Sequence, residues 1–146
     1  MVALAFGAED FTNDMGIERT DTGEEVQVPR SLVPVAARAA NVASLHSPFV
    51  LFQDPDALRA DAQRARQMGY TGKFAIHPAQ LDIINETFSP SAEEIAYARL
   101  IMAAWEEAEA AGRGSLAMDG RMVDVPVVKR AQNLLAFADA VEAQGR

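Results

Sequence analysis

Apolar and polar residues alternate along the first 88 residues in blocks that predict strands and helices in turn. Short apolar runs predict strands at residues 3–7 (ALAFG), 47–52 (SPFVLF) and 73–76 (KFAI). Helical spacing predicts helices over residues 30–40 and 54–69. Alternating units of this kind favour an α/β fold with three parallel, neighbouring strands and right-handed crossovers.

The two expected helices carry different signals. The first has an apolar stripe at helical spacing, made of Leu32, Val35, Ala36 and Ala39. The second has Asp54 as its expected N-cap, Pro55 at its first helical position and Gly69 as a stop. Between the first strand and the first helix, the polar stretch TNDMGIERTDTGEEVQVPR predicts a long functional loop with little internal structure.

From residue 89 onward the pattern becomes helical. Ser91 and Glu94 form a capping box at the start of a long helix. Its apolar stripe consists of Ile95, Ala98, Ile101, Met102 and Trp105. Asp119-Gly120, flanked by apolar residues, predicts a hairpin turn, and a last helix is expected over residues 125–141.

Composition narrows the class of protein. The chain has 146 residues, about half of them apolar, a formal net charge of -8 and no cysteine. Its length suits one ordinary domain with a real core. The acidic balance argues against nucleic-acid binding, since phosphate contacts need clustered Lys and Arg. The lack of cysteine excludes disulfides and thiolate sites within these residues. No apolar run is long enough for a membrane span, and we expect a cytoplasmic protein.

Candidate chemical residues follow the predicted strands, where parallel sheets bind their ligands. Asp10, at the end of the first strand beside Gly7, suits a Mg²⁺ site, since magnesium takes one or two carboxylates. The alternative is that Asp10 only caps the next turn. Strand alternation would turn Glu9 to the opposite face. His77 follows the third strand and either contacts a ligand or orients the loop.

Three other polar positions are weaker candidates. His46, placed in a loop before the second strand, is expected to be solvated. Arg19 and Arg30 frame the long first loop and either bind anions or form surface ion pairs. Asp119 lies in a tight turn that an Asp-Gly pair fills for conformational reasons alone.

Four segments together resemble a known family. They are FGAEDFTNDMG, ERT, the stretch that begins FAIHPAQ and runs through MDGRMVD, and PVVKRAQNLL. In this order and spacing they resemble the citrate lyase beta-subunit-like proteins and malyl-CoA lyases of the HpcH/HpaI aldolase superfamily. The resemblance covers nearly the whole chain.

The resemblance implies a lyase that cleaves or forms a carbon–carbon bond in a hydroxy-acid thioester, such as citryl-, malyl- or citramalyl-CoA. It implies Mg²⁺ as cofactor, Asp10 as a metal ligand, and substrate binding by the backbone around Gly7, Ala8 and Glu9. His77 would lie near the thioester. Asp119 matches an acidic residue that reaches a neighbouring subunit's active site and transfers a proton.

The resemblance also implies the fold and the partners. Complete relatives are (β/α)₈ barrels with a C-terminal helical extension, and form trimers or hexamers. Here residues 1–88 match the last three strand–helix units, a partial TIM barrel, and residues 89–146 match the extension. The arginine and first metal glutamate of the family lie outside the matched part. His46 and Leu51 stand where relatives often carry acidic residues.

Three hypotheses follow. The first is a Mg²⁺-dependent lyase that acts on an acyl-CoA or an acyl-carrier thioester, works as a homo-oligomer, and is incomplete and inactive as this chain alone. The second is a non-catalytic assembly or regulatory module. The third is a self-standing α/β domain that binds an acidic metabolite.

Overall fold

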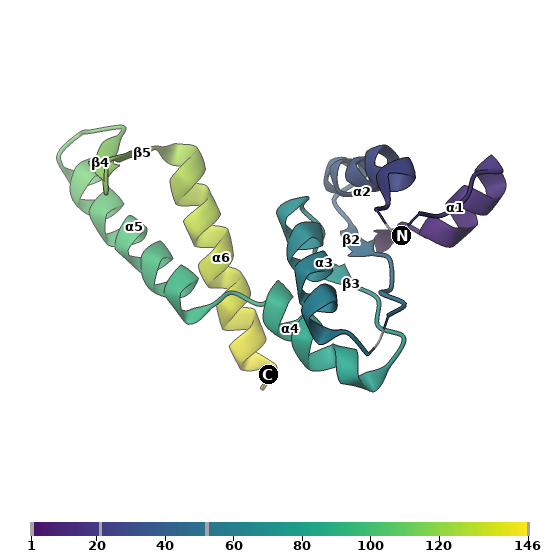
Figure 1. Cartoon of the computed structure of the whole chain (residues 1–146). Helices are drawn as coiled ribbons and strands as arrows, with labels where there is room; N and C mark the ends of the chain where they lie inside the picture. The colour runs from purple at the N-terminus through teal and green to yellow at the C-terminus, as the bar shows by residue number, and fades with distance from the viewer. Residues whose placement is uncertain (1, 21, 52, 146) are drawn as a thin grey trace. The chain divides into compact units, whose positions relative to one another are not determined.

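A computed structural model of the protein describes residues 2–20, 22–51 and 53–145. The chain divides into two compact units, Met1–Phe88 and Ser89–Arg146 (Figure 1). Within the described ranges, no helix is both long and apolar enough to cross a membrane.

The first unit is built on a three-stranded parallel sheet. Its strands are β1 (Ala3–Ala5), β2 (Ala43–His46) and β3 (Gly72–Lys73), hydrogen-bonded in the order β1-β2-β3. The register pairs His46 with Lys73, so these two residues lie side by side where β2 and β3 end. The predicted set of three parallel, neighbouring strands is confirmed.

The position predicted for the second strand is wrong. The strand is Ala43–His46, and residues 47–51 leave the sheet as an irregular segment, while Phe52 lies outside the described residues. Pro48 has no N–H to donate, and a central strand needs donors on both sides. The apolar run after it, which suggested a buried strand, lines a cavity instead.

Helix α1 (Ala8–Met15) occupies the start of the expected loop. Glu9 and Asp10 are in its first turn, and Gly16 ends it with φ +67°. The prediction that Glu9 and Asp10 point to opposite faces of a strand is therefore wrong, since successive helical residues are about 100° apart. The rest of the expected loop contains the short helix η1 (Glu24–Val26).

Helix α2 (Gln27–Ala39) begins three residues before its predicted start and packs on β1 and β2. The prediction that the apolar stripe of this helix faces the core is wrong, because the side chains of Leu32 and Val35 are 59% and 66% exposed. Pro34 and Ala37 are buried instead. These smaller side chains let the helix approach the strands closely, which the spacing of large apolar residues did not indicate.

The next helices begin where the sequence predicted. In α3 (Pro55–Gln67), Asp54 Oδ1 accepts a hydrogen bond from the backbone N–H three residues on, at 2.9 Å. Gly69 follows the helix with φ +97°. A short helix, η2 (Pro78–Gln80), starts at the predicted proline and leads into α4 (Leu81–Phe88).

The second unit is a helical pair with a hairpin. Helices α5 (Ala92–Ala110) and α6 (Val125–Ala143) pack on each other, and β4 (Leu116–Met118) pairs antiparallel with β5 (Arg121–Val123) (Figure 1). Its core consists of the buried residues Ala98, Ile101, Val123, Val128 and Ala131. Met102 and Trp105 pack against this core, so most of the predicted α5 stripe is confirmed.

The predicted start of α5 and the predicted hairpin turn are both confirmed. Ser91 and Glu94 form both hydrogen bonds of the capping box at the start of α5. The turn between β4 and β5 is Asp119-Gly120, with φ of +51° and +72°. Two consecutive residues with positive φ are typical of a two-residue hairpin turn, and Asp and Gly adopt that conformation most readily.

Candidate functional site

A cavity of about 430 Å³ lies in the first unit, next to the ends of β1 and β2. This volume is within the range of small-molecule sites. The residues that line it come from α1, the following loop, α2, the end of β2 and α3; those with charged or titratable side chains are Glu9, Asp10, Arg19, Arg30, His46, Asp61 and Arg64. The cavity thus has both acidic and basic groups at the edge of the sheet where the strands end.

The start of α1 forms one part of this cavity, with Gly7 and Asp10 among its lining residues. Gly7 is the N-cap of the helix, and no side chain caps the first turn. The first N–H groups of a helix have no intrahelical acceptor, and the helix dipole makes this end favourable for anions. The backbone of Ala8, whose side chain is buried, is therefore the part of that residue which can bind a carboxylate.

Asp10 fits a magnesium ion as a single protein ligand. In the described ranges, no three His, Asp or Glu side chains are grouped so that they could hold a metal. Magnesium, however, often uses one or two carboxylates and completes its shell with water and substrate oxygens. The exposed carboxylate of Asp10 in the cavity supplies one such ligand.

Glu9, the neighbour of Asp10, is paired with Arg19. Arg19 Nε donates to Glu9 Oε1 at 3.2 Å, and Arg19 Nη1 also donates to Glu25. Thr20 Oγ1 donates to Glu25 Oε2 at 2.6 Å. The hydrogen bond from the Thr20 side chain, and after it those from the backbone of Glu25 and from Arg19, lower the pKa of Glu25 to about 2. This set of contacts ties the loop after α1 to η1, and Glu9 is engaged in it.

A buried polar cluster forms another part of the cavity region. Lys73 Nζ lies 2.5 Å from Asp61 Oδ2, 2.6 Å from the backbone O of Ser47 and 3.0 Å from His46 Nδ1. Arg30 Nη1 lies 4.0 Å from Asp61 Oδ1. The cluster joins β2, β3, α2 and α3 where the strands end.

The expectation that His46 is solvated is wrong. His46 is the last residue of β2 and is 2% exposed. Its ring meets the ring of Tyr70 in an edge-on arrangement, with 4.8 Å between the ring centroids. Burial, and next the charge of Lys73, lower the pKa of His46 to about 4, so the ring is neutral at pH 7. Burial also lowers the pKa of Lys73, but Asp61 opposes that shift.

His77 is not among the described residues that line the cavity. It is the N-cap of η2, where its Nδ1 accepts from the N–H of Ala79 at 3.2 Å. Gln80, the last residue of η2, is 1% exposed and donates to the backbone O of Phe49 at 2.8 Å. Gln80 also accepts from the N–H of Ile76 at 2.9 Å. Gln80 therefore fixes the cavity-lining segment after β2.

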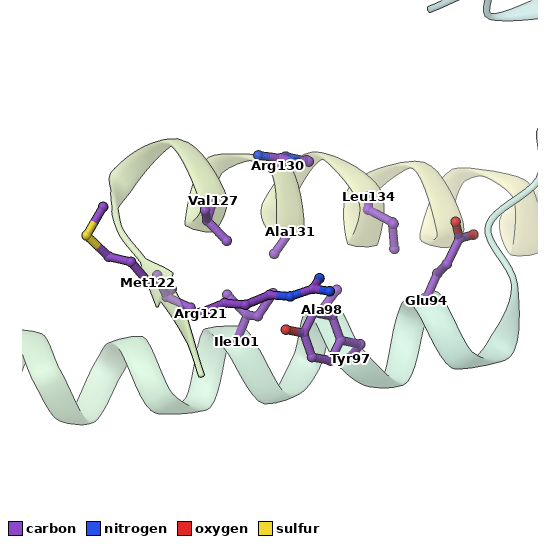
Figure 2. A pocket seen from close by; sticks show the side chains of 11 residues that line it. Glu94, Tyr97, Ala98, Ile101, Arg121, Met122, Val127, Arg130, Ala131 and Leu134 are labelled. Atoms are coloured by element: carbon purple, nitrogen blue, oxygen red, sulfur yellow. The ribbon is translucent and has the colours of Figure 1, made fainter. Parts of the chain in front are cut away.

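Asp119 belongs to the second unit, in the exposed turn between β4 and β5. That unit has a cavity of about 270 Å³ between α5 and α6. Figure 2 shows Val127, Ala131 and Leu134 of α6 pointing toward α5 across it. The acidic residue Glu94, which also lines this cavity, forms part of the capping box at the start of α5. This largely apolar gap offers little for catalysis compared with the cavity of the first unit.

Sequence reasoning missed Lys73, Asp61 and Gln80 as parts of the site. Lys73 lies at the start of a predicted strand and Asp61 within a predicted helix, and each is placed by partners distant in sequence. For Gln80 no local pattern indicated that its side chain reaches back to Phe49, 31 residues earlier in the chain. For Arg30 the sequence left open anion binding or a surface ion pair, and the structure places Arg30 Nη1 4.0 Å from Asp61 Oδ1.

The sequence model of the family described as HpcH/HpaI aldolase/citrate lyase matches residues 1–78. A citrate lyase subunit beta-like protein of Deinococcus radiodurans is 43% identical over 131 residues, which are 90% of this chain and 46% of that protein. The mitochondrial citramalyl-CoA lyase of Rattus norvegicus is 32% identical over 140 residues, 96% of this chain and 41% of the relative.

Solved structures with the same fold include the CitE protein of Mycobacterium tuberculosis, crystallised with magnesium, acetoacetate and coenzyme A. It matches with a TM-score of 0.79 and 30% identity, over 92% of this chain and 51% of that one. The chain thus spans about half the length of the relatives it matches.

Proposed function

Since this chain belongs to the HpcH/HpaI aldolase/citrate lyase family, we propose that it acts in a Mg²⁺-dependent lyase that cleaves or forms a carbon–carbon bond in a hydroxy-acid thioester. The observation that carries the proposal is the position of Asp10. Its carboxylate lies in a cavity of substrate size, beside the uncapped first turn of α1.

In this proposal Asp10 holds the metal, and the backbone N–H groups of Ala8 and Glu9 bind a substrate carboxylate at the helix N-terminus. A Mg²⁺ ion bound there would supply Lewis acidity, which stabilises negative charge on a substrate oxygen. Glu9 contributes through its backbone, since its side chain is paired with Arg19.

The thioester class is supported by the names of the relatives. Among them are citramalyl-CoA lyases and (3S)-malyl-CoA thioesterases, and the CitE crystals contained magnesium and coenzyme A. We assign His77 to the thioester end of the substrate and Asp119 to proton transfer. Asp119 would act in a neighbouring subunit, so the active form is a homo-oligomer.

The test is a calorimetric titration of the chain with Mg²⁺ in the presence of acetoacetate. We expect weak, saturable binding, because one carboxylate holds magnesium loosely and the ion gives up water reluctantly. Asp10→Asn should abolish it. The matched control is Asp14→Asn, which removes the same charge from the same helix outside the cavity.

Binding that survives Asp10→Asn would exclude Asp10 as the ligand. Loss of binding in Asp14→Asn as well would mean that only the general acidity of α1 attracts the ion. In either case the metal-dependent lyase would lose its structural basis in this chain.

A further inference from the structure

The buried ammonium group of Lys73 determines the tautomer of His46. The Lys73 side chain is 0% exposed, and its Nζ has three acceptors: a carboxylate oxygen of Asp61, the backbone O of Ser47 and Nδ1 of His46. An ammonium group has three N–H donors and no lone pair. Nδ1 of His46 must therefore accept, which places the proton of the neutral ring on Nε2.

The alternative, in which Nδ1–H donates to Asp61, does not fit the distances. Asp61 Oδ2 is 3.6 Å from His46 Nδ1, beyond hydrogen-bond length, whereas Lys73 Nζ is at 3.0 Å. The neutral charge state also agrees with the low pKa of His46, caused by burial and the charge of Lys73. The ring is thus held with Nε2–H as its donor.

Two N–H donors of this cluster have no acceptor within the described residues. They are His46 Nε2 and Arg30 Nε, and both atoms are buried. Buried donors are almost always hydrogen-bonded, because an unsatisfied one costs free energy. His46 and Arg30 both line the 430 Å³ cavity. The pair therefore leaves two unsatisfied donors among the side chains that line the cavity.

The charge of the cluster indicates what kind of acceptor fits these donors. Lys73 and Arg30 are cations, Asp61 is an anion and His46 is neutral, which leaves one positive charge in a buried setting. Buried charges are stable only when they are paired. A carboxylate supplies one negative charge and two acceptor oxygens, which matches both the charge and the number of free donors.

We propose that His46 and Arg30 form a carboxylate-binding subsite, in which Lys73 and Asp61 are positioning residues that orient the His46 ring. This subsite recognises a substrate carboxylate at the end of the cavity formed by β2, α2 and α3, apart from Asp10. The inference rests on the proposed function only in that a substrate occupies this cavity. His46 and Arg30 then determine which acids the protein accepts.

The test uses the ¹⁵N-labelled chain in Mg²⁺-free buffer, with malonate as the probe. Long-range ¹H–¹⁵N spectra report the protonation of each histidine ring nitrogen, and a His77→Asn variant assigns the two rings. At pH 7 we expect His46 to carry its proton on Nε2, and malonate to shift that signal in a saturable way. Lys73→Met should remove the tautomer preference.

Affinity for malonate gives the second readout. Arg30→Gln and His46→Phe should each weaken binding by about 10-fold or more, the usual effect of one hydrogen bond to a charged group. Arg64→Gln is the matched control, because it removes the same charge from the same cavity but none of the donors described. We expect it to weaken binding much less.

The inference is overturned if the proton is on Nδ1, if malonate leaves the Nε2 signal of the unmodified chain unmoved, or if Arg64→Gln weakens binding as much as Arg30→Gln. The first two results need no variant of the proposed subsite or of its positioning residues. Retained Mg²⁺ binding at Asp10 without a malonate shift counts against the subsite alone. A malonate shift without Mg²⁺ binding counts against the proposed lyase alone.

Discussion

The carboxylate of Asp10 lies directly over Gly7, since a Cβ atom placed on Gly7 would be 2.9 Å from Asp10 Oδ2. The backbone of Gly7 has φ -96° and ψ 98°, an extended conformation that any residue type can adopt. Glycine is therefore required here by the position of a side chain rather than by backbone strain, and the small residue leaves room for the carboxylate at the start of α1.

Gly7→Ala should displace the Asp10 carboxylate while the fold remains intact, because the crowded atom is the free end of a side chain. We expect Mg²⁺ affinity, measured by calorimetry, to fall by about tenfold, which corresponds to ~1.4 kcal/mol. Gly114→Ala is the control, since a Cβ there meets nothing within 4 Å. Equal affinity in Gly7→Ala and the unmodified chain would contradict the role given to this contact.

His46 should make the stability of the first unit depend on pH. Its folded pKa of about 4 lies below the ordinary value of 6.5, so the unfolded chain binds more protons between these values. The free energy of unfolding should fall by up to ~3 kcal/mol as pH drops from 6.5 to 4. Below pH 4 this contribution is lost completely.

Urea unfolding at a series of pH values measures this effect. His46→Asn, which keeps an acceptor near Lys73 but does not titrate, should flatten the slope between pH 6.5 and 4. His77→Asn, at the exposed start of η2, leaves the buried ring unchanged and should retain the slope. A slope that persists in His46→Asn would assign the pH dependence to other groups.

The helical pair of the second unit should depend on Ile101 but not on its neighbour Leu100. Ile101 is 6% exposed within the core of that unit, whereas Leu100 is 61% exposed. Ile101→Ala should lower the free energy of unfolding by about 2–5 kcal/mol. Leu100→Ala should change it by less than about 0.5 kcal/mol.

Fluorescence of Trp105, the single tryptophan, follows unfolding of this unit, because Trp105 packs against the same core. If Ile101→Ala and Leu100→Ala lower the free energy of unfolding by similar amounts, the face of α5 that contains Ile101 is not the buried one.

Asp119 should act in proton transfer rather than only in the turn. Asp119→Asn keeps a residue that tolerates the φ of +51°, so the hairpin should remain intact. In thioester cleavage by a complete enzyme that contains this chain, turnover should fall by about 10²–10⁴-fold, the usual range for a general acid or base. Amide spectra of β4 and β5 verify the turn.

The contribution of Asp119 to a neighbouring subunit has its own measurement. Mixing complete enzymes that carry Asp10→Asn with complete enzymes that carry Asp119→Asn should restore part of the activity, since some sites then contain both carboxylates. If the subunits exchange and the mixture stays as inactive as either variant, Asp119 acts within its own chain or serves only the turn.

Much of the local structure followed from the sequence alone, because its causes are local. Asp54 caps α3, Ser91 and Glu94 form the capping box, and Asp119-Gly120 forms the hairpin turn, each through contacts within a few residues. Strand–helix alternation determined the parallel sheet, and the four quoted segments indicated the family. Asp10 lies in the predicted region, although it is in a helix.

Tertiary structure decided the rest. The buried state of His46 depends on Tyr70 and Lys73, which lie more than 20 residues away along the chain, and the charge of Lys73 is paired with Asp61 of α3. No pattern near residue 46 contains these partners. The β2 strand likewise lies where both neighbouring strands can pair with it, and its apolar continuation lines the cavity. Burial and pairing are properties of the assembled fold, so only the assembled fold could determine them.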